Sequence, residues 1–483
     1  MADILIKNVT VYDGSGVTPT APQDVAISGD KIIAIGEALN LSADQIIDGS
    51  ALALAPGFID VHTHDDIEVI RNPEMLSKIS QGVTSVIVGN CGISASPLTL
   101  DQNPPDPLNL LGRQDEFKFA SFGAYVDAYN QAQPAINVAA LIGHTALRAQ
   151  AMTNLDQPAS ASEIAAMREA LTRALEQGAK GLSSGLAYAN ANAAPAAELQ
   201  ALAEQLAPFN GIYTTHLRTE FDGILDAMSE AFDLGQATNT PVVISHLKCA
   251  GTANWGRSTE ILAHLAAADV PCDCYPYSAS SSTLDLAQVT DEFEIFITWS
   301  DPHPQVAGQP LQQIADLWQM SLIDAAKKLQ PAGAVYHCMD NNDVEAILRH
   351  DNSMIGSDGL PCDPHPHPRL WGTFPRVLGH YARDKQLFSL AQAVHKMTGA
   401  SADTFTLNKR GYIRPDYFAD LVLFDPLTVN DEADYLNPTA PARGIVQVWV
   451  NGQLSFERQS SAKMTRAGRF LKNYHSKIEE NND

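Results

Sequence analysis

Short apolar runs alternate with longer amphipathic stretches through the middle of the chain. Apolar runs of this length, bounded by turn residues, predict buried strands, and an apolar repeat near 3.6 residues predicts helices. Eight such runs occur, and they end at His64, Cys91, His144, Ser184, His216, His246, Tyr277 and Asp358. An eightfold strand–helix repeat predicts an α/β fold with a TIM-like (β/α)8 barrel over residues 56–411.

The two ends of the chain have a different pattern. Residues 1–55 contain short strand-like runs, and the Gly29-Asp30 pair between two of them predicts a hairpin. The same pattern returns after residue 412, in the runs 419–425 and 444–452. We therefore predict that residues 1–55 and 412–483 together form a small β-sandwich domain.

One segment interrupts the strand–helix repeat. Residues from about 286 to 340 are acidic and contain prolines, and their pattern predicts a helix only around Leu322 to Leu329. We predict that this segment is an inserted subdomain over the mouth of the barrel.

Composition narrows the classes of partner. The net charge of -25 over 483 residues argues against nucleic acid and anionic membranes as partners. The N-terminal residues lack a basic segment followed by an apolar one, and no run of about 18 apolar residues occurs, so we predict neither a signal peptide nor a membrane span. Six scattered cysteines favour reduced thiols and a cytoplasmic protein. The sequence does not predict the oligomeric state.

Metal-ligand residue types gather where the predicted strands end. In a barrel the carboxyl ends of all strands meet at one face. Each residue alone has an ordinary alternative, because a cysteine often lies in a core, a histidine often only donates a hydrogen bond, and an aspartate often caps a helix. Together they predict a metal site, and imidazole with thiolate favours zinc over magnesium or manganese. The candidate ligands are His62, His64, Cys91, His216, His246 and Asp358.

A second cysteine pair has metal-like spacing. Cys272 and Cys274 are two residues apart within a predicted strand, so their side chains share one face. We interpret them as core thiols rather than as a metal pair.

The motifs resemble those of the amidohydrolase superfamily and, more closely, those of its N-acyl-D-amino-acid deacylases. The resemblance spans nearly the whole chain. It is carried by Pro-Gly-Phe-Ile-Asp-Val-His-Thr-His, Val-Gly-Asn-Cys-Gly, Gly-His-Thr-Ala-Leu-Arg, Gly-Leu-Ser-Ser-Gly-Leu-Ala-Tyr, Thr-His-Leu-Arg-Thr-Glu, Ser-His-Leu-Lys, Tyr-Pro-Tyr, Ser-Asp-Gly and His-Pro-Arg-Leu-Trp-Gly-Thr-Phe-Pro-Arg-Val-Leu-Gly.

The resemblance implies how the ligands divide between two metal positions. Cys91, His216 and His246 would form one tight zinc site. The second position, weak or empty in this family, would use His62, His64 and Asp358. Many superfamily members instead bridge two metals with a carboxylated lysine. Lys180 is the nearest candidate here, but it lies at the start of its strand, and Cys91 makes such a lysine unnecessary.

The resemblance also implies the reaction, which is zinc-dependent hydrolysis of the amide bond of a small N-acyl-D-amino acid. Zinc would activate water, and Asp358 would accept its proton and later protonate the leaving amine. Tyr188 would donate a hydrogen bond to the developing oxyanion, or would be an ordinary tyrosine at the barrel rim.

A substrate of this class carries a free carboxylate, so its site needs a cation. The resemblance implies Arg369 for this role, because a guanidinium can bind a carboxylate through two hydrogen bonds. Lys248, Tyr277 and Ser282 would assist it. Arg376 would either join them or be a surface or structural arginine.

The insert region lacks a cation for an acidic side chain. No Lys or Arg occurs between Arg257 and Lys327, whereas relatives that prefer acidic D-amino acids are expected to supply an arginine here. We therefore predict a substrate with an apolar side chain, or a basic one if Asp291, Glu292 or Glu294 faces inward.

Two other hypotheses for the function of the chain remain open. One is a cyclic-amide hydrolase of the hydantoinase or dihydroorotase type, against which Cys91 argues because a lysine is expected there. The other is a non-catalytic scaffold on the same fold. Such scaffolds typically lose metal ligands, and all six candidates are present in this chain.

Overall fold

A computed structural model describes residues 1–458 and 465–473. Each of the eight predicted strand positions holds a parallel strand, and one of the eight is interrupted at Leu141. These strands are β6 (Phe58–Asp60), β7 (Val83–Val88), β10 (Asn137–Ala140) with β11 (Ile142–Gly143), β12 (Gly181–Gly185), β13 (Ile212–His216), β14 (Val242–Ile244), β15 (Cys272–Cys274) and β20 (Ser353–Ile355).

The parallel strands pair in chain order. The pairing runs from β6 through β7 to β10, and from β11 through β12, β13, β14 and β15 to β20. An isolated parallel bridge between Thr63 and Gly359 joins the segments that follow β6 and β20. The backbone N–H of Asp358 also donates to the carbonyl of His62 at 2.7 Å. The carboxyl ends of the first and last strands are therefore held together.

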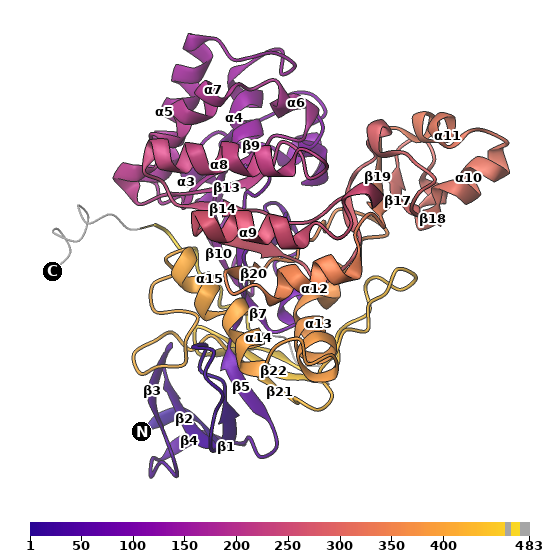
Figure 1. The fold of residues 1–483 in the computed structure, drawn as a ribbon. Helices are drawn as coiled ribbons and strands as arrows, with labels where there is room; N and C mark the ends of the chain where they lie inside the picture. Colours follow the sequence, from indigo (N-terminus) through magenta and orange to yellow (C-terminus); the bar gives the residue numbers. More distant parts are fainter. Residues whose placement is uncertain (459–464, 474–483) are drawn as a thin grey trace.

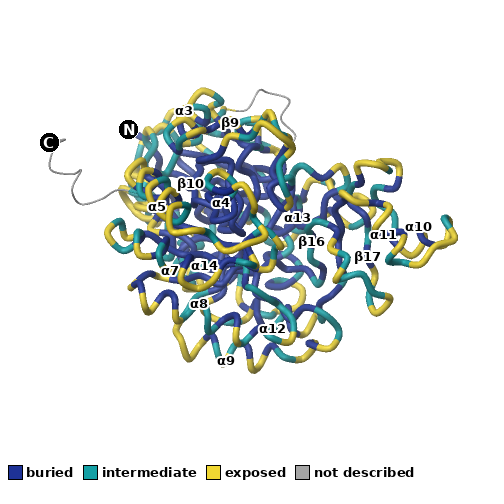
Figure 2. Tube along the Cα trace, turned by 90° about the horizontal axis from the view of Figure 1, so that it is seen from above, coloured by how far each residue is buried: buried dark blue, intermediate teal, exposed yellow. Residues whose placement is uncertain are grey.

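Helices follow most of the strands and cover them (Figure 1). Figure 2 shows buried chain at the centre of the molecule, with exposed positions on the outer helices. None of the helices in residues 1–458 and 465–473 is long and apolar enough to cross a membrane. The helices of this layer are α1 (Glu68–Arg71), α2 (Leu76–Ile79), α3 (Phe122–Ala132), α4 (His144–Ala151), α5 (Ala161–Glu176), α6 (Ala189–Asn192), α7 (Ala196–Ala203), α8 (Ile224–Thr238), α9 (Ser258–Ala268), α12 (Asn341–Arg349), α13 (Arg369–Arg376), α14 (Leu390–Met397) and α15 (Gly399–Thr404).

Local chemistry sets the limits of these helices. Ser160 caps α5 by accepting from the N–H of Glu163, whose side chain in turn accepts from the N–H of Ser160. Helix α8 ends at Asn239, which adopts the left-handed conformation that asparagine tolerates. The π-helix Val377–Asp384 directly follows α13, and the chain returns to the terminal sheet after α14 and α15.

The two ends of the chain form one connected sheet. Its order is β23-β22-β21-β5-β1-β2-β3, with β4 also pairing with β1. The predicted hairpin at Gly29-Asp30 is present, with Ser28 opposite Lys31. Residues 459–464 and 474–483 of the predicted domain lie outside the described residues. The strands are β1 (Ala2–Val11), β2 (Gln23–Ser28), β3 (Lys31–Gly36), β4 (Ala43–Asp48), β5 (Ala53–Pro56), β21 (Leu421–Phe424), β22 (Ile445–Val450) and β23 (Gln453–Glu457).

The insert has more structure than the sequence indicates. A four-stranded antiparallel sheet, in the order β16-β19-β17-β18, starts at Ser280, before the expected boundary near residue 286. A helix occupies the expected residues Leu322–Leu329, and a second one precedes it. Figure 1 shows this unit projecting to one side. Its elements are β16 (Ser280–Thr283), β17 (Ile295–Ser300), β18 (Gln309–Pro310), α10 (Leu311–Trp318), α11 (Leu322–Leu329) and β19 (Ala332–Tyr336). A further small pair joins β8 (Leu98–Thr99) to β9 (Lys118–Phe119).

Candidate metal centre and substrate cavity

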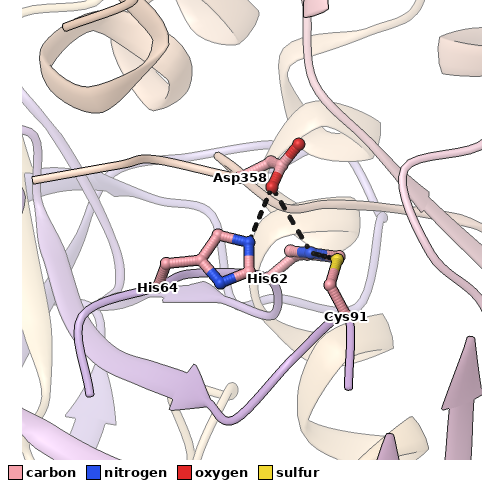
Figure 3. A group of neighbouring side chains, drawn as sticks. All are labelled: His62, His64, Cys91 and Asp358. Atoms are coloured by element: carbon pink, nitrogen blue, oxygen red, sulfur yellow. Dashed lines mark hydrogen bonds and ion pairs between the residues drawn. The ribbon is translucent and has the colours of Figure 1, made fainter. Parts of the chain in front are cut away.

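The six candidate ligands converge at the carboxyl ends of the parallel strands. They form two groups that share Cys91, and within each group the ligand atoms lie within 4.8 Å of one another. One group is His62, His64, Cys91 and Asp358, drawn in Figure 3. The other is Cys91, His216 and His246.

The first group is centred on the Asp358 carboxylate. Its Oδ1 lies 3.1 Å from Nε2 of His64 and 3.5 Å from Nε2 of His62. The same Nε2 of His62 lies 3.1 Å from Sγ of Cys91. In Figure 3 the side chains of these residues point toward one another. One metal ion placed between them would meet two imidazoles, a thiolate and a carboxylate.

The second group is centred on His246. Its Nε2 lies 3.3 Å from Sγ of Cys91 and 2.9 Å from Nδ1 of His216. On the other side of the ring, Nδ1 of His246 lies 2.9 Å from a Glu220 oxygen and 2.8 Å from Nζ of Lys248. Neighbours on the second ring nitrogen orient a metal-binding imidazole.

The backbone at three candidate ligands is unusual. Cys91, His246 and Asp358 have φ angles of 53°, 34° and 50°, in the left-handed region that non-glycine residues seldom adopt. Such conformations persist where the surrounding structure enforces them, and they cluster at functional sites. We infer that each strand end is turned so that its side chain faces the shared centre.

The first parallel strand ends before His62 and His64, whereas the sequence predicts that it continues to His64. Strand β6 ends at Asp60, so both rings follow the strand and do not stand on it. The bridge between Thr63 and Gly359 continues the pairing beyond the strand and fixes the segment that carries them. The two rings face one site, with centroids 5.6 Å apart.

Charges within the centre change the acidity of its members. Burial alone would raise the pKa of the Cys91 thiol, but His62 and His246 hold it well below its usual range. Burial would lower the pKa of His64 and His246, yet Asp358 and Cys91 beside His64, and Glu220 and Cys91 beside His246, raise each to about 9. The thiolate form is the one that binds metal. A dication would replace the protons that these imidazoles hold next to the thiolate.

Two carboxylates, the buried Asp273 and the partly exposed Glu220, support the ligands, and the sequence analysis did not identify them. Oδ1 of Asp273 lies 3.1 Å from Nδ1 of His62 and accepts from the backbone N–H of His246 at 2.9 Å. Glu220 contacts both His246 and Lys248, which hold its pKa below its usual range despite burial. Glu220 offered a signal by its position four residues after His216, whereas nothing local marks Asp273, which lies between Cys272 and Cys274.

The Cys272 and Cys274 thiols lie outside the centre. Both are buried, Cys272 beside the Ser353 hydroxyl and Cys274 beside the carbonyl of Met354. Burial raises the pKa of Cys272 to about 12 and that of Cys274 well above its usual value. Lys180 precedes β12, and its Nζ donates to the carbonyl of Thr406 at 3.1 Å. None of these three residues belongs to either ligand group.

A cavity of about 770 Å³ opens beside the ligands. His64, His216, His246 and Asp358 line it, together with the predicted substrate residues Tyr188, Lys248 and Ser282. The Tyr188 hydroxyl lies 3.4 Å from Oγ of Ser282, and its ring packs on His216. The base of the insert therefore forms one wall of the cavity, while α10 and α11 project away from it (Figure 1).

Three other predicted substrate residues are placed differently. Arg369 is fully buried, and its Nη2 lies 2.9 Å from Oδ2 of Asp358. Its Nε and Nη1 atoms have no hydrogen-bond partner among the described residues. Arg376 binds Asp431 at 3.0 Å and donates to the carbonyl of Pro276. Its guanidinium also lies over the ring of Tyr277, and none of Arg369, Arg376 and Tyr277 is among the described residues that line the cavity.

The charged residues around the cavity also differ from expectation. Asp291, Glu292 and Glu294 are exposed and do not line it. Its lining instead includes Asp285 of the insert together with Asp106 and Asp156. The two described cations in the lining are already paired, Lys248 with Glu220 at 2.5 Å and Arg218 with Glu230 at 2.6 Å.

Comparison with known proteins gives consistent matches. The model of the Amidohydrolase family matches residues 45–456. A D-aminoacylase from Alcaligenes xylosoxydans xylosoxydans is 46% identical over 473 residues, which is 97% of each chain.

Two solved structures match along nearly their whole length. A D-aminoacylase, studied for a binuclear metal centre with one-metal activation and second-metal attenuation, has a TM-score of 0.95 and 45% identity over 98% of this chain and 100% of that one. An N-acyl-D-glutamate deacylase from Bordetella bronchiseptica, complexed with zinc and a phosphonate inhibitor, has a TM-score of 0.93 and 43% identity over 98% of this chain and 99% of that one.

Proposed function

The chain belongs to the amidohydrolase family, and on this premise we propose that it hydrolyses N-acyl-D-amino acids to a carboxylate and a free D-amino acid. One observation carries the proposal, namely that Cys91, His216 and His246 converge in one ligand group beside a cavity that His216, His246 and Asp358 line. The extent of the similarity to D-aminoacylase supports the substrate class. We also propose that the parallel strands form a (β/α)8 barrel and the terminal strands a small β-sandwich.

The donor atoms fit zinc. Thiolate and imidazole are its usual protein ligands, and the buried Nδ1 of His64 has no hydrogen-bond partner in the part of the chain that the structure describes. We propose that Cys91, His216 and His246 hold one tight zinc ion and that His62, His64 and Asp358 provide a weaker position. When bound, zinc supplies Lewis acidity, which activates water and polarises the scissile carbonyl.

Asp358 is the proposed general base. Burial would raise its pKa, but Arg369 and the hydrogen bond from His64 hold it well below its usual range. The carboxylate is therefore ionised and able to accept the proton of the attacking water. It lines the cavity, so the same group can pass that proton to the leaving amine.

Tyr188 and Ser282 are proposed to contact the reacting amide. Their hydroxyls are neighbours in the cavity lining, 3.4 Å apart, with Tyr188 beside His216 and Ser282 on the insert. Burial keeps the pKa of Tyr188 well above its usual value, so its hydroxyl stays neutral and can donate a hydrogen bond. Such a donor stabilises negative charge that develops on the carbonyl oxygen.

Arg369 is proposed to serve the substrate carboxylate and Asp358 together. Its Nη2 contacts Asp358, while its Nε and Nη1, which have no hydrogen-bond partner within residues 1–458 and 465–473, would bind a second anion. Replacing Arg369 by methionine should lower kcat/KM more for substrates with a free α-carboxylate than for their methyl esters. The difference between the two losses should correspond to roughly 1.5–3 kcal/mol of activation free energy. Steady-state kinetics on both forms measures the difference. Equal losses would mean that Arg369 acts only through Asp358.

The substrate side chain is proposed to be apolar, with a basic one as the second choice. An acidic side chain in this cavity would meet Asp106 and Asp285 and find Lys248 and Arg218 already paired. Burying a carboxylate without a partner is costly, whereas a buried apolar side chain gains roughly 1.5–3 kcal/mol.

We expect N-acetyl-D-methionine to exceed N-acetyl-D-glutamate in kcat/KM by at least about tenfold, or ~1.4 kcal/mol. Parallel assays of the two substrates, with N-acetyl-D-lysine and a hydantoin added, measure the preference and also test cyclic-amide hydrolysis. A preference for the glutamate derivative would show that Lys248 or Arg218 leaves its carboxylate partner and binds the substrate side chain. Turnover of the hydantoin alone would overturn the proposed reaction.

A further inference from the structure

Lys78 is a buried lysine outside the proposed catalytic machinery. It lies on the short helix α2 and is 0% exposed. Its Nζ lies 2.9 Å from Oδ2 of Asp60, 2.9 Å from Oγ of Ser357 and 3.2 Å from Oδ2 of Asp65. The ammonium therefore has three neighbours that come from two different segments of the chain.

The neighbours of Lys78 flank the candidate ligands. Asp60 precedes His62 by two residues and Asp65 follows His64, while Ser357 directly precedes Asp358. Asp60 also accepts from the backbone N–H of Ser357 at 2.8 Å. One ammonium thus links the segment that carries both histidines to the segment that carries the proposed base.

Helix α2 is itself fixed in place. Gln81, just after the helix, donates to the carbonyl of Leu370 at 2.9 Å, and its side-chain oxygen accepts from the N–H of Phe374 at 3.3 Å. Both partners lie on α13, the helix that begins with Arg369. Lys78 is therefore held relative to the Arg369–Asp358 ion pair as well.

A contribution to folding stability does not by itself account for the cluster of Lys78 with Asp60, Asp65 and Ser357. A buried ion pair often contributes no more to folding than well-packed apolar side chains of similar volume. An ammonium, however, has three donors and can fix three acceptors in one arrangement, which an apolar side chain cannot do. The cluster is therefore suited to setting a geometry.

We propose that Lys78 is a positioning residue that sets the spacing between the imidazoles of His62 and His64 and the carboxylate of Asp358. This inference rests on the proposed function. The spacing concerned is the 3.1 Å and 3.5 Å that separate Asp358 from the two rings. Backbone hydrogen bonds still join the two segments without the ammonium, but the side chains of Asp60 and Ser357 lose their shared partner, so the weaker metal position and the base lose their alignment. The tight position takes its ligands from the ends of β7, β13 and β14 and does not depend on Lys78.

The test compares Lys78→Met with Lys396→Met. Lys396 is a matched control because it is also buried and donates to the carbonyl of Ser353, at the opposite end of β20. Metal-free protein is titrated with zinc alone, and kcat and KM are measured on the zinc-loaded enzyme. We expect Lys78→Met to bind the second zinc about 10–100-fold more weakly, with the first unchanged, and to lose kcat at constant KM. Lys396→Met should lower only Tm.

Ser357→Ala provides a second variant with a smaller change, because it removes one acceptor and no charge. It should weaken the second zinc in the same direction, and it carries the test if Lys78→Met does not fold. The proposal is overturned if a folded variant keeps both the second zinc affinity and kcat, if Lys396→Met reproduces the loss, or if the wild type binds no second zinc. The titration uses no substrate, so its outcome is separate from that of the proposed deacylation.

Discussion

Replacing Cys91 by alanine should remove the tightly bound zinc and lower kcat/KM by at least about a thousandfold. Cys91 belongs to both ligand groups, and its Sγ lies 3.1 Å from His62 and 3.3 Å from His246. It is the only soft anionic donor in either group. Loss of the thiolate leaves two neutral imidazoles at the tight position, which bind zinc far more weakly than a three-ligand site. Elemental analysis and steady-state kinetics measure both effects.

Cys274→Ala is the matched control for this variant. Cys274 is also buried, at the end of β15, and it belongs to neither ligand group. Burial raises the pKa of its thiol, so the thiol stays protonated. The control should keep its zinc and nearly full activity while losing some stability. A Cys91→Ala protein that retains zinc and wild-type turnover would show that the metal centre lies elsewhere.

The second large effect is expected for Asp358→Asn. This variant should keep the tight zinc, whose ligands Cys91, His216 and His246 are unchanged, and lose about 10²–10⁴ in kcat. The amide keeps the size of the side chain but cannot accept the proton of water at neutral pH. It also loses the charge that attracts Arg369 and His64. Zinc content measured beside kcat separates loss of the base from loss of the metal.

Asp156→Asn is the control for a carboxylate in the same cavity. Asp156 lines the cavity wall, is exposed and is not a member of either ligand group. Its kcat should stay within about twofold of wild type, because a screened surface charge contributes little. If Asp358→Asn keeps its zinc and its kcat, another group must accept the proton.

Strand positions and ligand types could be predicted because each has a local signal. The eight apolar runs predicted the eight parallel strands, since buried strands need continuous apolar residues whatever surrounds them. His62, His64 and Asp358 were found because a polar residue directly after such a run is conspicuous. Their meeting at one place then follows from the parallel arrangement.

Residues whose role depends on distant partners could not be predicted. Asp273 stands between two core cysteines, and nothing local indicates that it contacts His62 and His246. Strand β16 consists of Ser280–Thr283, a run of hydroxyl residues without the apolar alternation that marks a strand. Arg369 was expected to serve only the substrate, whereas its ion pair with Asp358 appears only in three dimensions.

The most direct test of the proposed function is the chirality of the product from racemic N-acetylmethionine. Zinc-loaded protein is incubated with the racemate, and the free methionine is separated on a chiral column. We expect D-methionine alone, with half of the substrate left as the N-acetyl-L form, and no release after the zinc is chelated. Release of L-methionine, or of no methionine from fully zinc-loaded protein, would contradict the proposal.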